Sequence, residues 1–173
     1  VVDGTANTTY SVFLSNGATN GATPAHGTLS NASRNFASLT NALGQLTSGD
    51  SNIAIGYYAG YSLTTESENI LIGDSAGKLL SGGANNSVAI GAYALDAATT
   101  GYGNTAIGHS ACSAVTLGDF NTCVGSLAGN GLQNADRNVV IGFDADGAAN
   151  SDKQIAIGKL EMELVKFHSQ VHQ

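Results

Sequence analysis

The sequence has little charge, almost no proline and no tryptophan. Charged residues make up 11% of its 173 residues, against about 25% in a typical globular domain, and there is one proline. The single proline excludes a collagen-like chain. Six basic residues against 13 acidic ones leave no basic patch for phosphates, so we expect no nucleic-acid binding. No apolar run approaches the roughly 18 residues of a membrane span, so we expect no membrane insertion.

Cysteine is also scarce. Cys112 and Cys123 are the only two in the chain, too few for a disulfide framework or a zinc set. We interpret them as two small buried apolar side chains, which leaves the redox compartment open.

A repeat of about 17 residues organises what is present. Seven short β-branched segments each end in a glycine, and the intervals between these glycines are 17, 18, 17, 17, 17 and 16 residues. The glycines are Gly56, Gly73, Gly91, Gly108, Gly125, Gly142 and Gly158. An alanine follows three residues after each of the first six. A fixed period of this kind predicts a stack of similar coils.

Each repeat predicts one short strand that is apolar on both faces. Ile53 and Ile55 point one way and Ala54 the other, because strand side chains alternate. The small middle residue suits a narrow coil interior, whereas the flanking pair needs a second covering surface. The simplest partner for identical coils is another copy of the chain. The asparagine before the strand, such as Asn52, is expected to stack on its equivalent in the next coil.

The predicted fold class is therefore all-β, a parallel β-solenoid or β-roll of about seven 17-residue coils, intertwined or packed as a homotrimer. We expect three regions: an N-terminal cap or connector (1–50), the β-roll repeat domain (51–159) and a C-terminal cap (160–173) that is a short strand or the start of a coiled coil. Within the first region, 8–15 reads as a strand, and 16–17 and 20–21 read as turns. Residues 30–46 fit either a short amphipathic helix or a degenerate coil.

The segment Asn86-Ser87-Val88-Ala89-Ile90-Gly91 and its equivalents resemble the head repeat of trimeric autotransporter adhesins, the YadA-like left-handed parallel β-roll. They resemble still more the related repeat of phage tail fibres that end in a self-cleaving intramolecular chaperone. The resemblance covers about 52–160. It implies a trimeric fibre on a virion, or alternatively on a bacterial cell surface, whose task is attachment to a host receptor, a glycan or an outer-membrane component.

Signals for an enzyme are weak, and we expect neither catalysis nor a cofactor. Hexapeptide-repeat acyltransferases have a period of six, which does not divide 17 or 16. Ice-binding solenoids need threonine in every coil, whereas only Thr105 and Thr122 begin strands here. A carbohydrate-active solenoid enzyme stays open as an alternative function, behind the phage fibre and the bacterial adhesin head.

Aromatic side chains on turns are the candidates for ligand contact, because flat rings beside hydrogen-bonding groups stack on sugars. Contacts between subunits would produce the same pattern. The candidates are Tyr57, Tyr58, Tyr61, Tyr93, Tyr102 and Phe143.

Three features were weighed as metal or catalytic sites. His168 and His172, four residues apart, could bind a metal ion on a trimer axis, although a polar cap is the simpler interpretation. Asp144 and Asp146, with Asp136 and Asp152, could bind calcium weakly. His109 is interpreted as a histidine of a solvent-facing loop.

Overall fold

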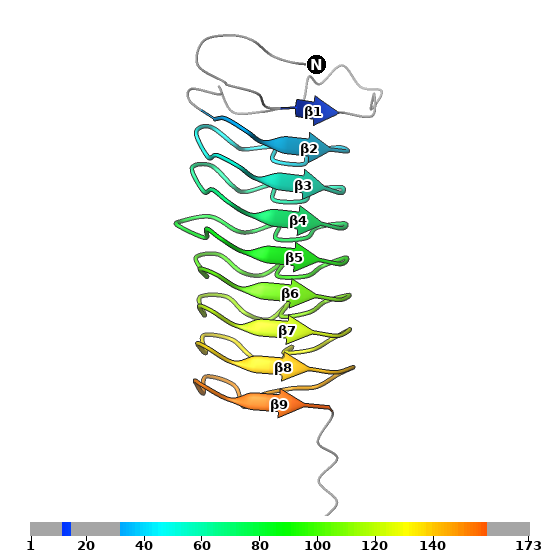
Figure 1. Cartoon of the computed structure of the whole chain (residues 1–173), viewed down its shortest axis with the longest axis vertical. Helices are drawn as coiled ribbons and strands as arrows, with labels where there is room; N and C mark the ends of the chain where they lie inside the picture. Colours follow the sequence, from blue (N-terminus) through cyan, green and yellow to red (C-terminus); the bar gives the residue numbers. More distant parts are fainter. Residues whose placement is uncertain (1–11, 15–31, 159–173) are drawn as a thin grey trace, which may run out of the picture.

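The chain winds into a stack of short coils, and each coil adds one strand to a single parallel sheet (Figure 1). This computed structural model describes residues 12–14 and 32–158. The strands are β1 (Val12–Leu14), β2 (Phe36–Ser38), β3 (Ile53–Ile55), β4 (Ile70–Ile72), β5 (Val88–Ile90), β6 (Thr105–Ile107), β7 (Thr122–Val124), β8 (Val139–Ile141) and β9 (Ile155–Ile157). The predicted all-β parallel solenoid with coils of about 17 residues is confirmed.

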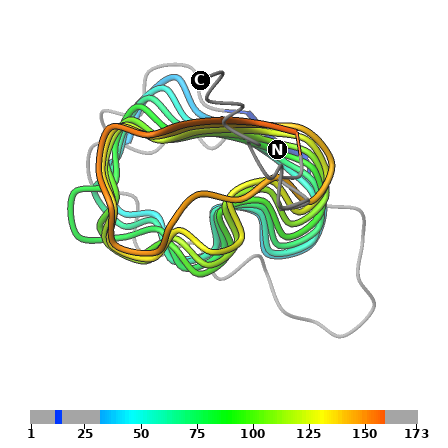
Figure 2. The same cartoon turned by 90° about the horizontal axis from the view of Figure 1, so that it is seen from below.

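Each coil is a flattened loop with the strand on one long side and a turn-rich wall on the other (Figure 2). Neighbouring strands pair residue for residue, so equivalent positions of the repeat lie directly above one another. The turn-rich wall is held by backbone hydrogen bonds between coils, such as that from Leu95 N–H to the carbonyl of Ala111 at 3.1 Å. Within 12–14 and 32–158, no helix is long and apolar enough to cross a membrane.

The interior is a narrow column of small and medium apolar side chains. The middle residue of each strand from β2 to β9 is buried. So is the alanine three residues after each strand-end glycine, namely Ala59, Ala76, Ala94, Ala111, Ala128 and Ala145. As predicted, the small middle residues face the coil interior.

Residues of neighbouring coils face one another across this interior in what we term diagonal pairs, most of which combine one large and one small residue, whereas Gly77/Ala89 combines two small ones. A diagonal pair joins the residue four positions after the strand-end glycine to the middle strand residue of the next coil. The pairs include Leu43/Ala54, Gly60/Leu71, Leu95/Ala106, Cys112/Cys123 and Gly129/Val140. A Cβ on Gly60 would lie 2.6 Å from Cδ1 of Leu71, so the glycine makes room for the leucine. The column therefore fills to high density without a uniform residue at either position.

The strand-end glycines combine a turn conformation with a close approach to the next coil. They adopt positive φ values, such as +135° at Gly108. A Cβ on Gly108 would lie 2.5 Å from the carbonyl oxygen of Gly125 in the next coil. Turn conformation and close backbone approach thus coincide at one position.

The coil stack begins before residue 51. Residues 32–50, placed by the sequence in the N-terminal cap or connector, form a coil with β2, so of the two alternatives for 30–46 the degenerate coil is correct. Leu39 stands where later coils have glycine and adopts φ +80°, while Ala42 keeps the buried alanine position. The strand expected at 8–15 contains β1. The turns expected at 16–17 and 20–21, and the cap at 160–173 with His168 and His172, lie outside the described residues.

Two ladders of side-chain hydrogen bonds run along the stack. In the inner ladder, the backbone N–H of Asn121 donates to Oδ1 of Asn104 in the preceding coil at 2.8 Å, and the Asn121 Nδ2 donates to the same oxygen at 3.2 Å. The inner ladder comprises Asn35, Asn52, Asn69, Ser87, Asn104, Asn121, Asn138 and Gln154. This confirms the stacking expected of the asparagine before each strand.

The outer ladder lies two residues earlier and has the opposite direction. There the backbone N–H of Asp119 donates to Oδ1 of Asp136 in the following coil at 2.9 Å. Its acceptors are Asp50, Ser67, Asn85, Asp119, Asp136 and Asp152. Each interior coil that carries both ladders is therefore tied to the coil before it and to the coil after it.

Candidate functional site

The outer surface of the sheet is an apolar strip, which we term the strand face. It consists of the first and third residues of β2 to β9, which point away from the coil interior and are half-buried or exposed. None of these positions is charged. Exposure is greatest at the C-terminal end, where Ile155 is 76% and Ile157 is 71% exposed. Contiguous apolar surface of this kind usually marks an interaction site.

The strand face is not uniform along its length. The first strand position is Phe36 at the N-terminal end and Ile155 at the C-terminal end of the strip, but Thr105 and Thr122 in the centre, with Val88 and Val139 beside them. The regular register places equivalent residues of neighbouring coils about 4.8 Å apart. A partner that covers the whole strip must match this spacing.

Three of the six candidate aromatic residues form one cluster on the coil of β3. The ring centroids of Tyr57 and Tyr58 are 4.4 Å apart, and those of Tyr58 and Tyr61 are 4.9 Å apart. Lys78 Nζ, from the next coil, lies 5.2 Å from the centre of the Tyr58 ring. A hydrogen bond to Tyr58 raises the pKa of Tyr57, which is 49% exposed.

The remaining candidates lie in separate places. Tyr93 contacts His109, with ring centroids 6.0 Å apart, and both are exposed. Tyr102 packs against Phe120 at 5.4 Å, near the start of the strands rather than their end. Phe143 is 71% exposed. The involvement of Phe120 was missed, although Phe120 directly follows Asp119, the residue one coil after Tyr102.

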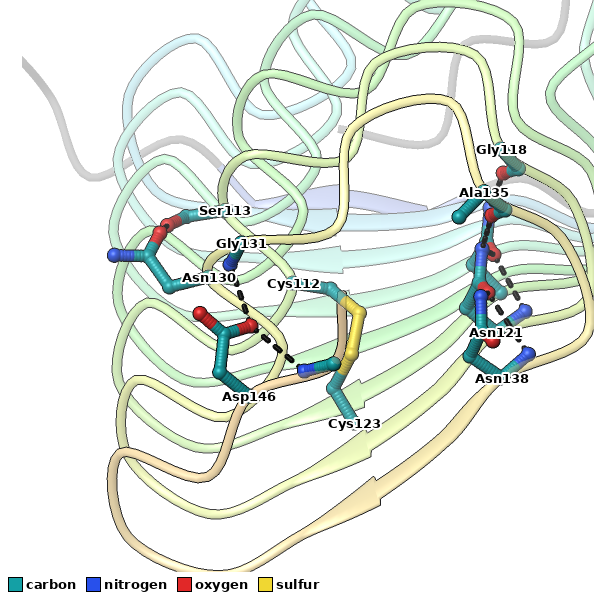
Figure 3. Close-up of a disulfide and its surroundings, with 12 residues drawn as sticks. Cys112, Ser113, Gly118, Asn121, Cys123, Asn130, Gly131, Ala135, Asn138 and Asp146 are labelled. Carbon is teal, nitrogen blue, oxygen red and sulfur yellow. Dashed lines mark hydrogen bonds between the residues drawn. A yellow bond between two sulfur atoms is a disulfide. The ribbon is translucent and has the colours of Figure 1, made fainter. Parts of the chain in front are cut away.

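The two cysteines form a disulfide, a pairing that the sequence interpretation as two small buried apolar side chains did not include (Figure 3). Both are fully buried, as expected, and their Cα atoms are 5.8 Å apart. Cys112 lies on the turn-rich wall of one coil, and Cys123 is the middle residue of β7 in the next. They are a diagonal pair, and a sequence separation of 11 gives no hint of this until the coil path is known.

The acidic residues of the C-terminal coils do not form a metal centre. Asp136 and Asp152 are members of the outer ladder. Asp146 Oδ1 accepts the N–H groups of Gly131 at 2.7 Å and Gly147 at 3.0 Å (Figure 3). Over the described part of the chain, no three His, Cys, Asp or Glu side chains are grouped so as to hold a metal ion. The calcium alternative therefore has no support from these four aspartates.

One buried carboxylate has a structural role. Glu66 is 2% exposed, and its Oε2 accepts the N–H groups of Thr64 at 2.6 Å and Thr65 at 3.0 Å. Its Oε1 accepts the N–H of Gly83 at 3.2 Å, in the enlarged coil after β4. Burial pushes the pKa of Glu66 upward, but these hydrogen bonds outweigh it and the pKa lies below its usual value.

The described residues thus provide two surfaces for contact: a long apolar strand face and aromatic groups at the coil corners. The carboxylate groups and the disulfide just described hold neighbouring coils together. No protein family, curated protein or solved structure matches the chain.

Proposed function

We propose that the chain is a non-enzymatic, receptor-binding segment of a fibre that assembles as a homotrimer through the strand face. The observation that carries this proposal is the two-sided strand. The middle residues fill the interior of a single coil, while the flanking isoleucine and valine side chains remain partly exposed along the whole sheet.

A second copy of the chain is the partner that fits this surface best. Its own strand face repeats at the same spacing, so each strand of one copy lies against an equivalent strand of the other. Burial of one isoleucine side chain is worth roughly 1.5–3 kcal/mol, and the strip repeats such positions in successive coils. A threefold arrangement closes the strip around one axis and leaves no strand face uncovered.

The sequence resemblance to phage tail-fibre repeats supports the attachment role. A rod with its apolar side turned inward presents its turns and corners outward. A virion fibre that contacts a host surface receptor uses a surface of this kind. The receptor class is a glycan or an outer-membrane component.

Sedimentation equilibrium of the purified chain tests the assembly. We expect a single species of three times the chain mass, and a monomer would refute the proposal. Ile107→Lys places a charge in the middle of the strand face and is expected to dissociate the trimer. Thr100→Lys is the matched control, because Thr100 is exposed outside the strand face and should leave the trimer intact.

A further inference from the structure

One corner of the coils carries a row of aromatic side chains. It lies just after the strand ends, beyond the arrowheads in Figure 1, at the two residues that follow each strand-end glycine. We term Tyr57, Tyr58, Tyr93, His109 and Phe143 the corner row. Tyr57 is 49%, Tyr93 44% and Phe143 71% exposed.

Two members of the corner row occupy a backbone conformation that does not suit them. Tyr58 and Tyr93 have φ values of +56° and +60°. The same position holds Ser75 at +56°, Ser110 at +52°, Asp144 at +52° and one other bulky residue, Leu127, at +62°. A bulky residue in the left-handed region costs stability relative to the small polar residues that normally occupy it. Folding does not require the tyrosines, because neighbouring coils make the same turn with serine.

The spacing of the row fits a linear ligand. From Tyr58 to Tyr93, and again from His109 to Phe143, the step is two coils, or about 10 Å. The coil between the first pair contributes Asp74 and Ser75, whose side chains hydrogen-bond to each other at 2.8 Å. Within each of these two pairs, one coil with a hydrogen-bonding group at its corner therefore separates the aromatic residues, whereas Tyr93 and His109 lie in adjacent coils.

From this placement we infer that the corner row binds a linear glycan laid parallel to the rod axis. Sugar rings stack on the aromatic faces through their C–H surfaces, and their hydroxyl groups meet the polar side chains of the intervening coils. The ring faces of an extended pyranose chain recur at regular steps, and the aromatic residues lie one or two coils apart, at multiples of the coil spacing. This inference rests on the proposed attachment function and names its ligand class and its surface.

An array of immobilised hexasaccharides tests the inference directly. The array carries cello-, chito-, malto- and uronic-acid hexamers, and the full chain is applied in its assembled form. We expect at least one linear hexasaccharide to be retained. Tyr58→Ser, Tyr93→Ser and Phe143→Ser should each weaken its binding by about tenfold or more. Serine already occupies the equivalent positions at Ser75, Ser110 and Ser126, so these variants should fold.

Tyr102→Ser is the matched control, since Tyr102 lies at the opposite corner and Ser67 holds its equivalent position. It should leave glycan binding unchanged within about twofold. Retention of no hexasaccharide, or an equal loss in Tyr102→Ser, would overturn the inference. Sedimentation of the same samples separates the two proposals. If the corner variants dissociate the trimer, the aromatic residues serve contact between subunits and the glycan inference fails. If the unmodified chain is a monomer, it is the proposed assembly that fails.

Discussion

At the scale of single residues, the coil depends on positions where an added Cβ atom would clash with the neighbouring coil. Gly108 is the clearest case, because its conformation and its contact with the next coil both exclude a side chain. Leu39 shows how the first described coil tolerates a different residue: φ falls to +80° there, whereas Gly108 is at +135°. The strand-end position therefore demands glycine most where a coil stacks tightly on the next.

Gly108→Ala is expected to lower the free energy of unfolding by more than about 2 kcal/mol, because the new Cβ meets the carbonyl of Gly125. This loss lies in the upper part of the range for strained backbone positions. Urea unfolding measures the change. Gly83→Ala is the control: Gly83 also has positive φ, at +101°, but a Cβ there meets nothing within 4 Å. Equal losses in the two variants would show that backbone conformation alone, and not close approach, sets the requirement.

Glu66 predicts a pH dependence. Because its pKa is lower in the folded chain than in the unfolded chain, its carboxylate stabilises the fold above the unfolded value, and this contribution disappears as the pH falls through the folded value. Glu66→Gln should therefore lower stability by about 1–2 kcal/mol at pH 7 and by progressively less as the pH falls below the usual pKa of glutamate. Thermal unfolding of both proteins across this range gives the comparison. A difference that is constant with pH would contradict the role of the charge.

The regular spacing of particular residues made much of the fold predictable from the sequence. The glycine and alanine periods predicted the solenoid, the strand positions and the asparagine ladder, because all three features join residues that are one repeat apart in the sequence. The coil of Leu39 was not recognised as a regular unit because a leucine stands at the strand-end position that is glycine in the later repeats. Its asparagine before the strand, Asn35, and its buried alanine, Ala42, do follow the repeat. The disulfide was missed because the partners of a diagonal pair are defined only by the path around the coil. The ligand contacts of the aromatic candidates remain a prediction.

At the scale of the coil, neighbouring units are matched by diagonal pairs as well as by hydrogen bonds. Most pairs combine one large and one small residue, such as Leu95 with Ala106. Cys112 and Cys123 are equal in size, and the covalent bond joins them across the interior. A disulfide here fills the space that leucine and alanine fill in the preceding pair.

Cys112→Leu with Cys123→Ala replaces the disulfide by the residues of that preceding pair. The variant should fold, but with a free energy of unfolding about 3 kcal/mol below that of the oxidised protein, the value expected when a loop of this length loses its cross-link. Cys112→Ala with Cys123→Ala is the comparison, and it should be less stable still, because it also leaves a void. Urea unfolding without reductant measures all three. If the two variants were equally stable, the diagonal pair would not act through volume.

At the scale of the whole molecule, the rod is a sum of coils in which each contacts only its neighbours. Removal of one coil should then succeed when the coils brought together match. Deletion of residues 87–103 places Gly77 opposite Ala106, the same residue types as Gly77 and Ala89 in the intact chain. Deletion of residues 52–68 removes the same number of residues but places Leu43 opposite Leu71.

We expect the first deletion to fold cooperatively and the second to be less stable by about 1–3 kcal/mol, the usual cost of an overpacked core. Circular dichroism and urea unfolding of both proteins test this. Equal stability of the two deletions would indicate that hydrogen bonds along the stack, and not the diagonal pairs, decide which coils can be neighbours.

The opposite directions of the two ladders affect how such a molecule can change its length. Because an interior coil accepts on one ladder from the neighbour to which it donates on the other, gain or loss of one unit leaves the same chemistry at the new junction. Gln154, the last described member of the inner ladder, differs from the others, since its side chain turns back to the carbonyl groups of Ala148 and Ser151. The number of coils thus sets the length of the rod. Duplication of a 17-residue stretch lengthens it by about 4.8 Å, and Gln154 remains the last member of the described inner ladder.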